Sequence, residues 1–459
     1  MRLLNTYSLK FEEFFDSNIP HYGILSHRWE KDEVSFETMS AWSRRLPKPT
    51  NDEPLDPASL TDEDGVFGTG AGFRKVIDFC KLCQSNGLKW GWVDTCCIDK
   101  RSSAELSEAI NSMYRWYGGA KICFAYLSDV DFSTHDGTRP DPQTPGTDDP
   151  HWLAFRRSKW FTRGWTLQEL LAPLVVQFYD HNWRSIGDRG KLRLDIHMAT
   201  GISEDILFYP RYKIAAASVA QKMSWLSSRQ TSRGEDIAYC MFGLFDINLP
   251  LLYGEGRAKA FHRLQLEIIR TCDDESIFAW RATYDLDSTR LPPCSPLLAQ
   301  HPAYFATSAQ IHRKRQAVAL RAAFTVSSKG MDVSVPNCRG REVAIDFVKL
   351  RDENELSLYH VKRFSGKHTY FYVLLALGCY GPSLPSKPIT IVLEKHRDGT
   401  FERVHDIKAM NFIPPLPEIS FSELFEELKN DCITVRVRNT SAWYDMLQPP
   451  SPDQPDPEW

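Results

Sequence analysis

The first 205 residues alternate short apolar runs with segments of helical periodicity, and this alternation constrains the fold more than any other feature of the chain. The runs predicted to be strands are Tyr22–Ser26, Lys89–Ile98, Ile122–Leu127 and Leu174–Tyr179. Strands that alternate with helices pair in parallel through right-handed crossovers. We therefore predict an α/β fold with a doubly wound parallel sheet, a kind of sheet that binds ligands beyond the carboxyl ends of its strands.

The rest of the chain changes character twice, so several domains are expected from its length of 459 residues. Apolar residues first recur at helical spacing, then alternate as in β-strands, and a proline-rich tail closes the sequence. The predicted regions are the α/β domain (1–205), a helical domain (206–285), a β-rich C-terminal domain (286–447) and a disordered tail (448–459). Two polar stretches at 44–70 and 131–150 are predicted to be surface segments.

Composition excludes several classes of protein. The 55 basic and 59 acidic residues give a net charge of −4, which offers no general attraction to nucleic acid or to anionic membranes. No secretory signal and no apolar run long enough to span a membrane is found. The eleven cysteines are scattered and odd in number, so we expect free thiols and a cytoplasmic location. Cys80 and Cys83 lack a second pair at zinc spacing, and no metal site is predicted.

Polar and aromatic side chains follow the predicted strands or begin the helices after them. Because the carboxyl ends of parallel strands share one edge of a sheet, we expect these side chains to meet there. The candidate ligand-binding residues are Ser26, His27, Arg28, Trp29, Trp92, Asp94, Asp99, Glu105, Arg163 and Trp165, and the candidate catalytic residue is Glu169.

Each candidate also has a structural interpretation. Three Ser/Thr-x-x-Glu pairs have the spacing of a capping box: Ser102 with Glu105, Thr166 with Glu169, and Ser232 with Glu235. Glu169 is thus either a helix cap or a carboxylate that faces a ligand. Arg163 is either a ligand contact or the partner of a nearby aspartate, and Trp92 and Trp165 are either core residues or stacking surfaces. His27, Asp94 and Asp99 are open to the same two interpretations.

Three segments resemble the fungal heterokaryon-incompatibility (HET) domain, and they occur in its order. They are LSHRW at Leu25–Trp29, WVDTCCIDK at Trp92–Lys100 and RGWTLQELLAP at Arg163–Pro173. The segment Ser218–Ile269 is similar to the helical region that often follows this domain, so the resemblance covers about residues 1–285. It implies a role in non-self recognition and in cell death, together with an upstream incompatibility partner protein.

A second resemblance is to Toll/interleukin-1 receptor (TIR) domains, which have a flavodoxin-like fold. Those domains often carry W-C-x-x-E-L with a catalytic glutamate that cleaves NAD+; here the matching residues are Trp165, Glu169 and Leu170, and Thr166 stands where cysteine is usual. The resemblance implies a TIR-like NAD+ hydrolase that self-associates into a homo-oligomer, with Glu169 as the catalytic carboxylate and NAD+ as substrate rather than bound cofactor. The other interpretation is a non-catalytic death-signalling adaptor that acts by oligomerising.

Overall fold

The computed structural model divides the chain into two compact units, Met1–Ala216 with Ser228–Ala260, and Ala217–Ser227 with Phe261–Trp459. The structure describes residues 1–15, 18–45, 70–135, 149–281, 294–295 and 297–314, and then 325–327, 330–336, 342–345, 360–365, 368–376, 379–382, 389–395, 401–404 and 432–437. Most of both predicted surface segments and all of the predicted tail lie outside these residues. The predicted domain boundaries at 205 and 285 stay predictions.

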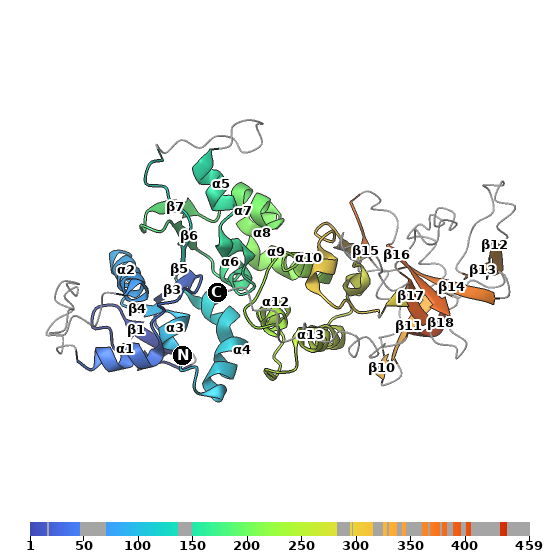
Figure 1. Cartoon of the computed structure of the whole chain (residues 1–459), viewed down its shortest axis with the longest axis horizontal. Coiled ribbons are helices and arrows are strands. Elements are labelled where there is room, and N and C mark those ends of the chain that lie inside the picture. The colour runs from blue at the N-terminus through green and yellow to red at the C-terminus, as the bar shows by residue number, and fades with distance from the viewer. Residues whose placement is uncertain are drawn as a thin grey trace, which may run out of the picture. The chain divides into compact units, whose positions relative to one another are not determined.

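The first unit begins with strands and helices in alternation and ends in short helices (Figure 1). Its elements are β1 (Arg2–Asn5), β2 (Phe11–Glu13), β3 (Tyr22–His27), α1 (Phe36–Ser43), α2 (Ala71–Ser85), β4 (Trp90–Trp92), α3 (Asp94–Cys97), α4 (Ser103–Gly119), β5 (Ile122–Tyr126), α5 (Pro150–Arg156), η3 (Lys159–Thr162), α6 (Thr166–Leu171), β6 (Val176–Tyr179), β7 (Ser185–Asp188), α7 (Arg193–Thr200), α8 (Glu204–Phe208), α9 (Pro210–Ala216), α11 (Asp236–Tyr239) and α12 (Phe242–Phe245).

The sheet of this unit is mixed, with the order β2-β1-β4-β3-β5-β6-β7. Its four central strands, β4, β3, β5 and β6, are parallel, as the alternation of strands and helices predicts. The edges differ from the prediction of a parallel sheet, because β1 and β2 on one side and β7 on the other add antiparallel strands. The α/β class is therefore confirmed, and the all-parallel sheet is corrected to a mixed one.

The connections reverse direction at one point in the sheet. From β3 the chain moves outward to β4, and it then returns to the other side of β3 to form β5 and β6. The β3–β5 pair is therefore a topological switch point, where the carboxyl ends of parallel strands leave a crevice for ligands. Residues Ser26 and His27 lie at the carboxyl end of β3, paired with Ala125 and Tyr126 of β5.

The alternation of side chains along β3 separates two faces of the sheet. A Cβ atom added to Gly23 would lie 2.6 Å from Cys83 Sγ of α2, so Gly23 faces α2, and Leu25 and His27 share its face. Ser26 points the opposite way, because it hydrogen-bonds to a residue of α6. Helix α2 thus covers one face, and α4 with α6 cover the other (Figure 1).

Local sequence explains the long helix α4 and corrects one predicted strand. Ser102 caps α4 by accepting from the backbone N–H of Glu105 (3.2 Å), which is one half of the predicted capping box; the Glu105 carboxylate accepts from the backbone N–H of Asp99 instead of Ser102. The predicted strand Lys89–Ile98 is wrong over its second half: only Trp90–Trp92 is strand, and Asp94–Cys97 is the short helix α3. That turn of helix places Asp94 at the carboxyl edge of the sheet.

The predicted capping box of Ser232 and Glu235 is also wrong. Glu235 is itself the N-cap residue of α11 and makes no side-chain cap. Its carboxylate instead accepts from the backbone N–H groups of Gly254 (2.9 Å) and Gly256 (3.0 Å), two glycines with positive φ. The Glu235 carboxylate therefore bonds to a later turn of the chain instead of capping its own helix.

The second unit combines short helices with strands. Its elements are α10 (Val219–Ser224), the larger part of α13 (Arg257–Thr271), η4 (Glu275–Phe278), β8 (Cys294–Ser295), η5 (Pro302–Phe305), β9 (His312–Arg313), β10 (Thr325–Ser327), β11 (Gly330–Pro336), β12 (Glu342–Ile345), β13 (His360–Ser365), β14 (His368–Ala376), β15 (Cys379–Tyr380), β16 (Thr390–Lys395), β17 (Phe401–Val404) and β18 (Cys432–Val437). A nine-stranded sheet runs β10-β11-β18-β17-β16-β14-β13-β12, with β8 beside β17.

Within this unit, α10 begins with a complete capping box formed by Ser218 and Gln221. The helix packs against η4 and η5, and Ser218 Oγ also donates to the carbonyl of Ile311 (2.6 Å). In the described part of the chain, none of the helices is both long and apolar enough to cross a membrane.

Candidate functional site

Glu169 occupies a buried polar centre on the α4–α6 face of the sheet, above the switch point. Its Oε2 atom accepts a hydrogen bond from Ser26 Oγ (2.5 Å), and Ser26 Oγ in turn accepts from Trp160 Nε1 (3.0 Å). The backbone carbonyl of Glu169 accepts from Cys123 Sγ of β5 (3.8 Å). Helix α6 therefore places the carboxyl group directly over the β3–β5 pair. Ser26, Trp160 and Glu169 together form the Glu169 centre.

The geometry overturns the capping-box interpretation of Thr166 and Glu169. The N-cap of α6 is Trp165, which has helical backbone angles and no side-chain cap. Thr166 Oγ1 donates to the carbonyls of Trp160 (2.6 Å) and Arg163 (2.9 Å). Because the Glu169 carboxyl turns to β3 instead of its own helix, a cap does not account for a glutamate at this position.

The surroundings of Glu169 favour its neutral form. The residue is 6% exposed, and burial raises the pKa of its carboxyl to about 8, against the opposing hydrogen bond from Ser26. The charge of Arg163 also opposes the rise, but no cation makes a direct ion pair with Glu169 among the described residues. At neutral pH the Glu169 centre therefore holds a protonated acid.

A second polar centre lies on the α2 face of the same strand end. His27 is 4% exposed, and its Nε2 atom lies 3.5 Å from Glu33 Oε2 and 3.8 Å from Asp94 Oδ1. Glu33 Oε1 binds Lys75 Nζ (2.5 Å), and Lys75 is 6% exposed. Burial alone raises the pKa of Glu33, but His27 and Lys75 outweigh it and lower that pKa to about 2. His27, Glu33 and Lys75 together form the Glu33 centre.

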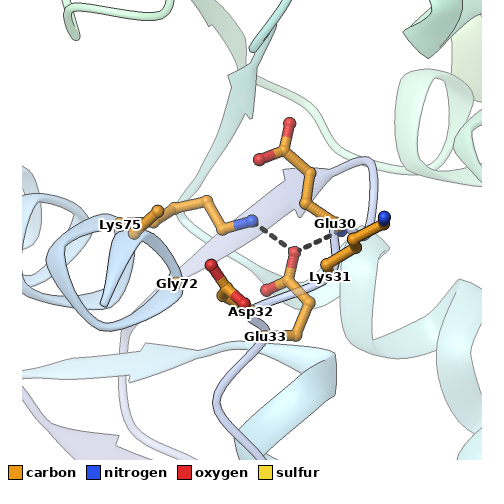
Figure 2. A pocket seen from close by; sticks show the side chains of 7 residues that line it. Glu30, Lys31, Asp32, Glu33, Gly72 and Lys75 are labelled. Carbon is orange, nitrogen blue, oxygen red and sulfur yellow. Dashed lines mark hydrogen bonds and ion pairs between the residues drawn. The ribbon is translucent and has the colours of Figure 1, made fainter.

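A hollow of about 270 Å³ adjoins the Glu33 centre (Figure 2). It is lined by Glu30, Lys31, Asp32, Glu33, Ala71, Gly72 and Lys75. In Figure 2, Lys75 reaches from α2 to Glu33, which also accepts from the backbone N–H of Glu30 (2.8 Å). Glu169 does not line this hollow, because it lies on the other face of the sheet.

A third group of side chains surrounds Trp29 at the carboxyl edge of the sheet. Its indole is 42% exposed and donates from Nε1 to Asp94 Oδ2 (2.7 Å). Lys100 Nζ lies 3.5 Å from the centroid of the ring, and Arg163 Cζ lies 5.6 Å from it. Segments from three distant parts of the sequence therefore meet at this edge, as the parallel-sheet prediction requires.

Other candidate residues lie elsewhere or face the core. Trp92 is fully buried and packs edge-to-face against Trp116 (5.7 Å) and Tyr117 (5.9 Å). Trp165 is half-buried and donates to Asp236 (3.2 Å). The Trp92 contacts are those of a core residue, whereas Trp165 is held by its hydrogen bond to Asp236.

Asp99 and Glu105 serve the backbone at the start of α4. Glu105 Oε1 accepts from the backbone N–H of Asp99 and from Arg2 Nη1, both at 2.8 Å. Asp99 bonds to Arg101, whose guanidinium lowers the pKa of Asp99 to about 2. Arg28 is half-buried just beyond the end of β3. The structure thus groups Ser26, His27, Trp29, Asp94, Arg163 and Glu169, and gives Trp92, Asp99 and Glu105 other contacts.

Two groups of side chains, a cysteine pair and a cluster of two aspartates with a histidine, are of types that can bind a metal ion. Cys80 and Cys83 are both buried, and burial raises the pKa of each thiol above its usual range, which disfavours the thiolate that a metal requires. Asp131, Asp180 and His181 bring three ligand atoms within 4.8 Å of one another. Asp180 there already accepts from three backbone N–H groups, which accounts for its position in the loop.

Sequence reasoning missed Glu33, Lys75 and Lys100 as parts of the site. A signal existed for Lys75, because it lies on the buried stripe of α2, one turn before Phe79. A lysine on an apolar helix face requires a buried partner, and Glu33 supplies it. No comparable pattern marks Glu33, which is 42 residues away.

One family match includes the parallel strands β3, β4 and β5 and both polar centres, and it ends before β6. Residues 22–169 match the model described as Heterokaryon incompatibility protein (HET), so this part of the chain is a HET domain. Residues 259–337 match a domain of unknown function, DUF8212.

The chain is also similar to Vegetative incompatibility protein HET-E-1 of Podospora anserina, with 41% identity over 253 residues. That match covers 54% of this chain and 16% of the relative, so the chain corresponds to a small part of that protein's length. No solved structure gives a significant match.

Proposed function

We propose that this chain is a HET-domain effector of fungal non-self recognition that leads to programmed cell death. The support is the HET match over residues 22–169 and the similarity to a vegetative incompatibility protein. The HET match includes the strand ends that carry the polar centres.

The proposed activity is TIR-like cleavage of NAD+, with Glu169 as the catalytic residue. The observation that carries it is the position of Glu169: a buried carboxyl over the β3–β5 switch point, bonded to Ser26 and free of any capping role. The parallel strands follow the order 2-1-3-4 counted from β3, which is the order of flavodoxin-like sheets. That order agrees with the TIR resemblance around Trp165 and Leu170.

The chemistry requires one carboxylate and no general acid. The bond between ribose C1′ and the nicotinamide nitrogen breaks, its electron pair goes to the ring nitrogen, and nicotinamide leaves as a neutral molecule. The ribose then carries positive charge until water adds and releases a proton, and an ionised Glu169 stabilises that charge. A cationic substrate favours ionisation of a neighbouring acid, so Glu169 loses its proton when NAD+ binds.

Burial of Glu169 implies that the resting chain is inactive. At 6% exposure, the carboxyl is not reached by a dinucleotide until α6 or the neighbouring loops move. Self-association into a homo-oligomer, triggered by an upstream incompatibility partner, supplies such a rearrangement in this proposal.

The test is nicotinamide release from NAD+ by the purified full chain, alone and under crowding that promotes assembly. We expect activity that rises with assembly and falls by at least about 100-fold in Glu169→Gln, because the amide cannot carry the required charge. Glu267→Gln, a change at a partly exposed helical ion pair with Arg270, is the matched control and should retain activity. Absence of nicotinamide release under every assembly condition would remove the hydrolase proposal.

The second candidate is a non-catalytic adaptor that signals death by oligomerising. It is favoured by the same burial of Glu169 and by the location of the hollow beside Glu33 instead of Glu169. Expression of Glu169→Gln in a fungal host separates the two candidates. Cell death that persists at unchanged protein level supports the adaptor, whereas loss of death with retained oligomers supports the enzyme.

A further inference from the structure

Two cations lie beside the exposed Trp29 indole at the carboxyl edge of the sheet. Lys100 Nζ is 3.5 Å from the ring centroid and Arg163 Cζ is 5.6 Å from it, distances at which a cation is attracted by an aromatic face. The ring is itself fixed, because Nε1 donates to Asp94 Oδ2 (2.7 Å). The segments that carry Trp29, Lys100 and Arg163 are far apart in the sequence, so the grouping is a product of the fold.

Neither cation is neutralised by an ion pair among the residues that the structure describes. The acidic groups that act on Lys100 are Asp94 and Glu33. Asp94 Oδ2 accepts from Trp29 and Glu33 binds Lys75, and neither carboxylate forms an ion pair with Lys100 among the described residues. Glu169 adds no full negative charge, since its pKa of about 8 keeps it protonated at neutral pH.

Burial lowers the pKa of Lys100, and the charges of Asp94 and Glu33 oppose this change. The positive charge of Arg163 adds to the lowering, because the two cations repel each other. Like charges held close together are unfavourable unless an anion joins them. A guanidinium binds phosphate oxygens through two parallel N–H groups, and an ammonium adds a point charge beside it. The face of Trp29 is already covered by Lys100, so this ring supports the cations instead of stacking on a base.

We infer that Lys100 and Arg163, supported by Trp29, form a binding site for a phosphate-bearing anion, which we assign to the diphosphate of the dinucleotide substrate. The assignment to the dinucleotide rests on the proposed function, whereas the anion site itself does not. Lys100 is thereby given a binding role that neither its motif nor the comparisons assign.

Binding of inorganic pyrophosphate to the full chain tests the anion site, measured by calorimetry at low and at moderate salt. We expect Lys100→Gln and Arg163→Gln each to weaken binding by roughly tenfold, the effect of losing one hydrogen bond to a charged group. Lys121→Gln and Arg74→Gln remove exposed cations elsewhere on the same unit and should leave binding unchanged. Equal loss in the controls, or no pyrophosphate binding by the unaltered chain, overturns the site.

Two further measurements distinguish failure of the anion site from failure of its assignment to the dinucleotide. Arg163→Lys keeps the charge but not the paired N–H groups, so intermediate affinity supports the clamp and full affinity argues against it. In the Glu169→Gln chain, competition between NAD+ and pyrophosphate supports assignment to the dinucleotide, and independent binding overturns that assignment. Pyrophosphate binding that depends on Lys100 and Arg163, without NAD+ cleavage in any condition, keeps the anion site and removes the hydrolase.

Discussion

Two carboxyl groups at the end of one strand have opposite protonation states, and their surroundings explain why. Glu169, on the α4–α6 face, is bonded to a hydroxyl and has no direct cationic partner, so burial raises its pKa to about 8. Glu33, on the α2 face, binds the buried Lys75 and adjoins His27, so its pKa falls to about 2. On β3, Ser26 contacts Glu169 and the adjacent His27 contacts Glu33.

The comparison shows how a single strand end can hold two chemically distinct sites. Alternation of side chains sends Ser26 and His27 to opposite faces, and each face supplies a different partner for its carboxyl. Titratable groups whose environments push their pKa values apart are typical of functional sites. The contrast supports the proposed chemical role for Glu169, which is neutral in the resting chain and ionises when substrate binds, and a structural role for the ionised Glu33.

The largest expected effect is on the pH dependence of stability. Glu169 ionises near 4.5 in the unfolded chain and near 8 in the folded one. Between these values the folded state holds a proton that the unfolded state has lost, so stability is full below pH 4.5 and falls as pH rises to about 8. The slope is about 1.4 kcal/mol per pH unit, and Glu169→Gln removes it. Urea unfolding of both proteins at pH 5, 6, 7 and 8 measures this difference.

The Glu33 centre provides the opposite case within the same experiment. Its lowered pKa contributes stability above pH 4.5 that is lost as pH falls towards 2. Glu169→Gln should leave this acid limb unchanged while flattening the limb between pH 5 and 8. An unaltered slope between pH 5 and 8 in this variant would show that Glu169 is ionised in the folded chain.

The second-largest expected effect compares the buried ion pair of Lys75 and Glu33 with the exposed pair of Lys81 and Asp78 on the same helix. Lys75→Met removes the lysine partner of Glu33, and loss of one partner of a buried pair costs about 3–5 kcal/mol. Lys81→Met removes an exposed pair with Asp78, in which the side chains are 52% and 37% exposed, and should cost less than about 1 kcal/mol. Urea midpoints at pH 7 compare them, and equal losses would contradict a buried role for Lys75.

The sequence predicted the parallel core of the sheet because hydrophobic periodicity is a local signal. It also predicted that Ser26–Trp29, Asp94 and Arg163–Glu169 would meet, because parallel strands share their carboxyl edge. The antiparallel edges were not predicted, since β1, β2 and β7 are strands of three or four residues with little periodicity to detect.

The partners of individual carboxyl groups could not be predicted from spacing. Glu105, Glu169 and Glu235 all stand three residues after a Ser or Thr, yet only the first accompanies a side-chain cap at the predicted position. Glu169 instead bonds to Ser26, 143 residues away, and Glu235 to the glycines of a distant turn. A local pattern predicts that a carboxylate is available near a helix start, and the tertiary fold decides what it contacts.

The smallest expected effect tests the hydrogen bond between Ser26 and Glu169. Ser26→Ala removes the hydroxyl that donates to Glu169 Oε2 and accepts from Trp160 Nε1, and an unpartnered buried donor costs about 1–3 kcal/mol. Because the Ser26 hydrogen bond lowers the pKa of Glu169, its loss raises that pKa above 8, and stability should keep falling beyond pH 8. Ser85→Ala, which removes an exposed hydroxyl on α2, is the control and should change neither quantity. If Ser26→Ala lowers stability equally at every pH, then Ser26 supports only Trp160, and the coupling between β3 and the Glu169 carboxyl is absent.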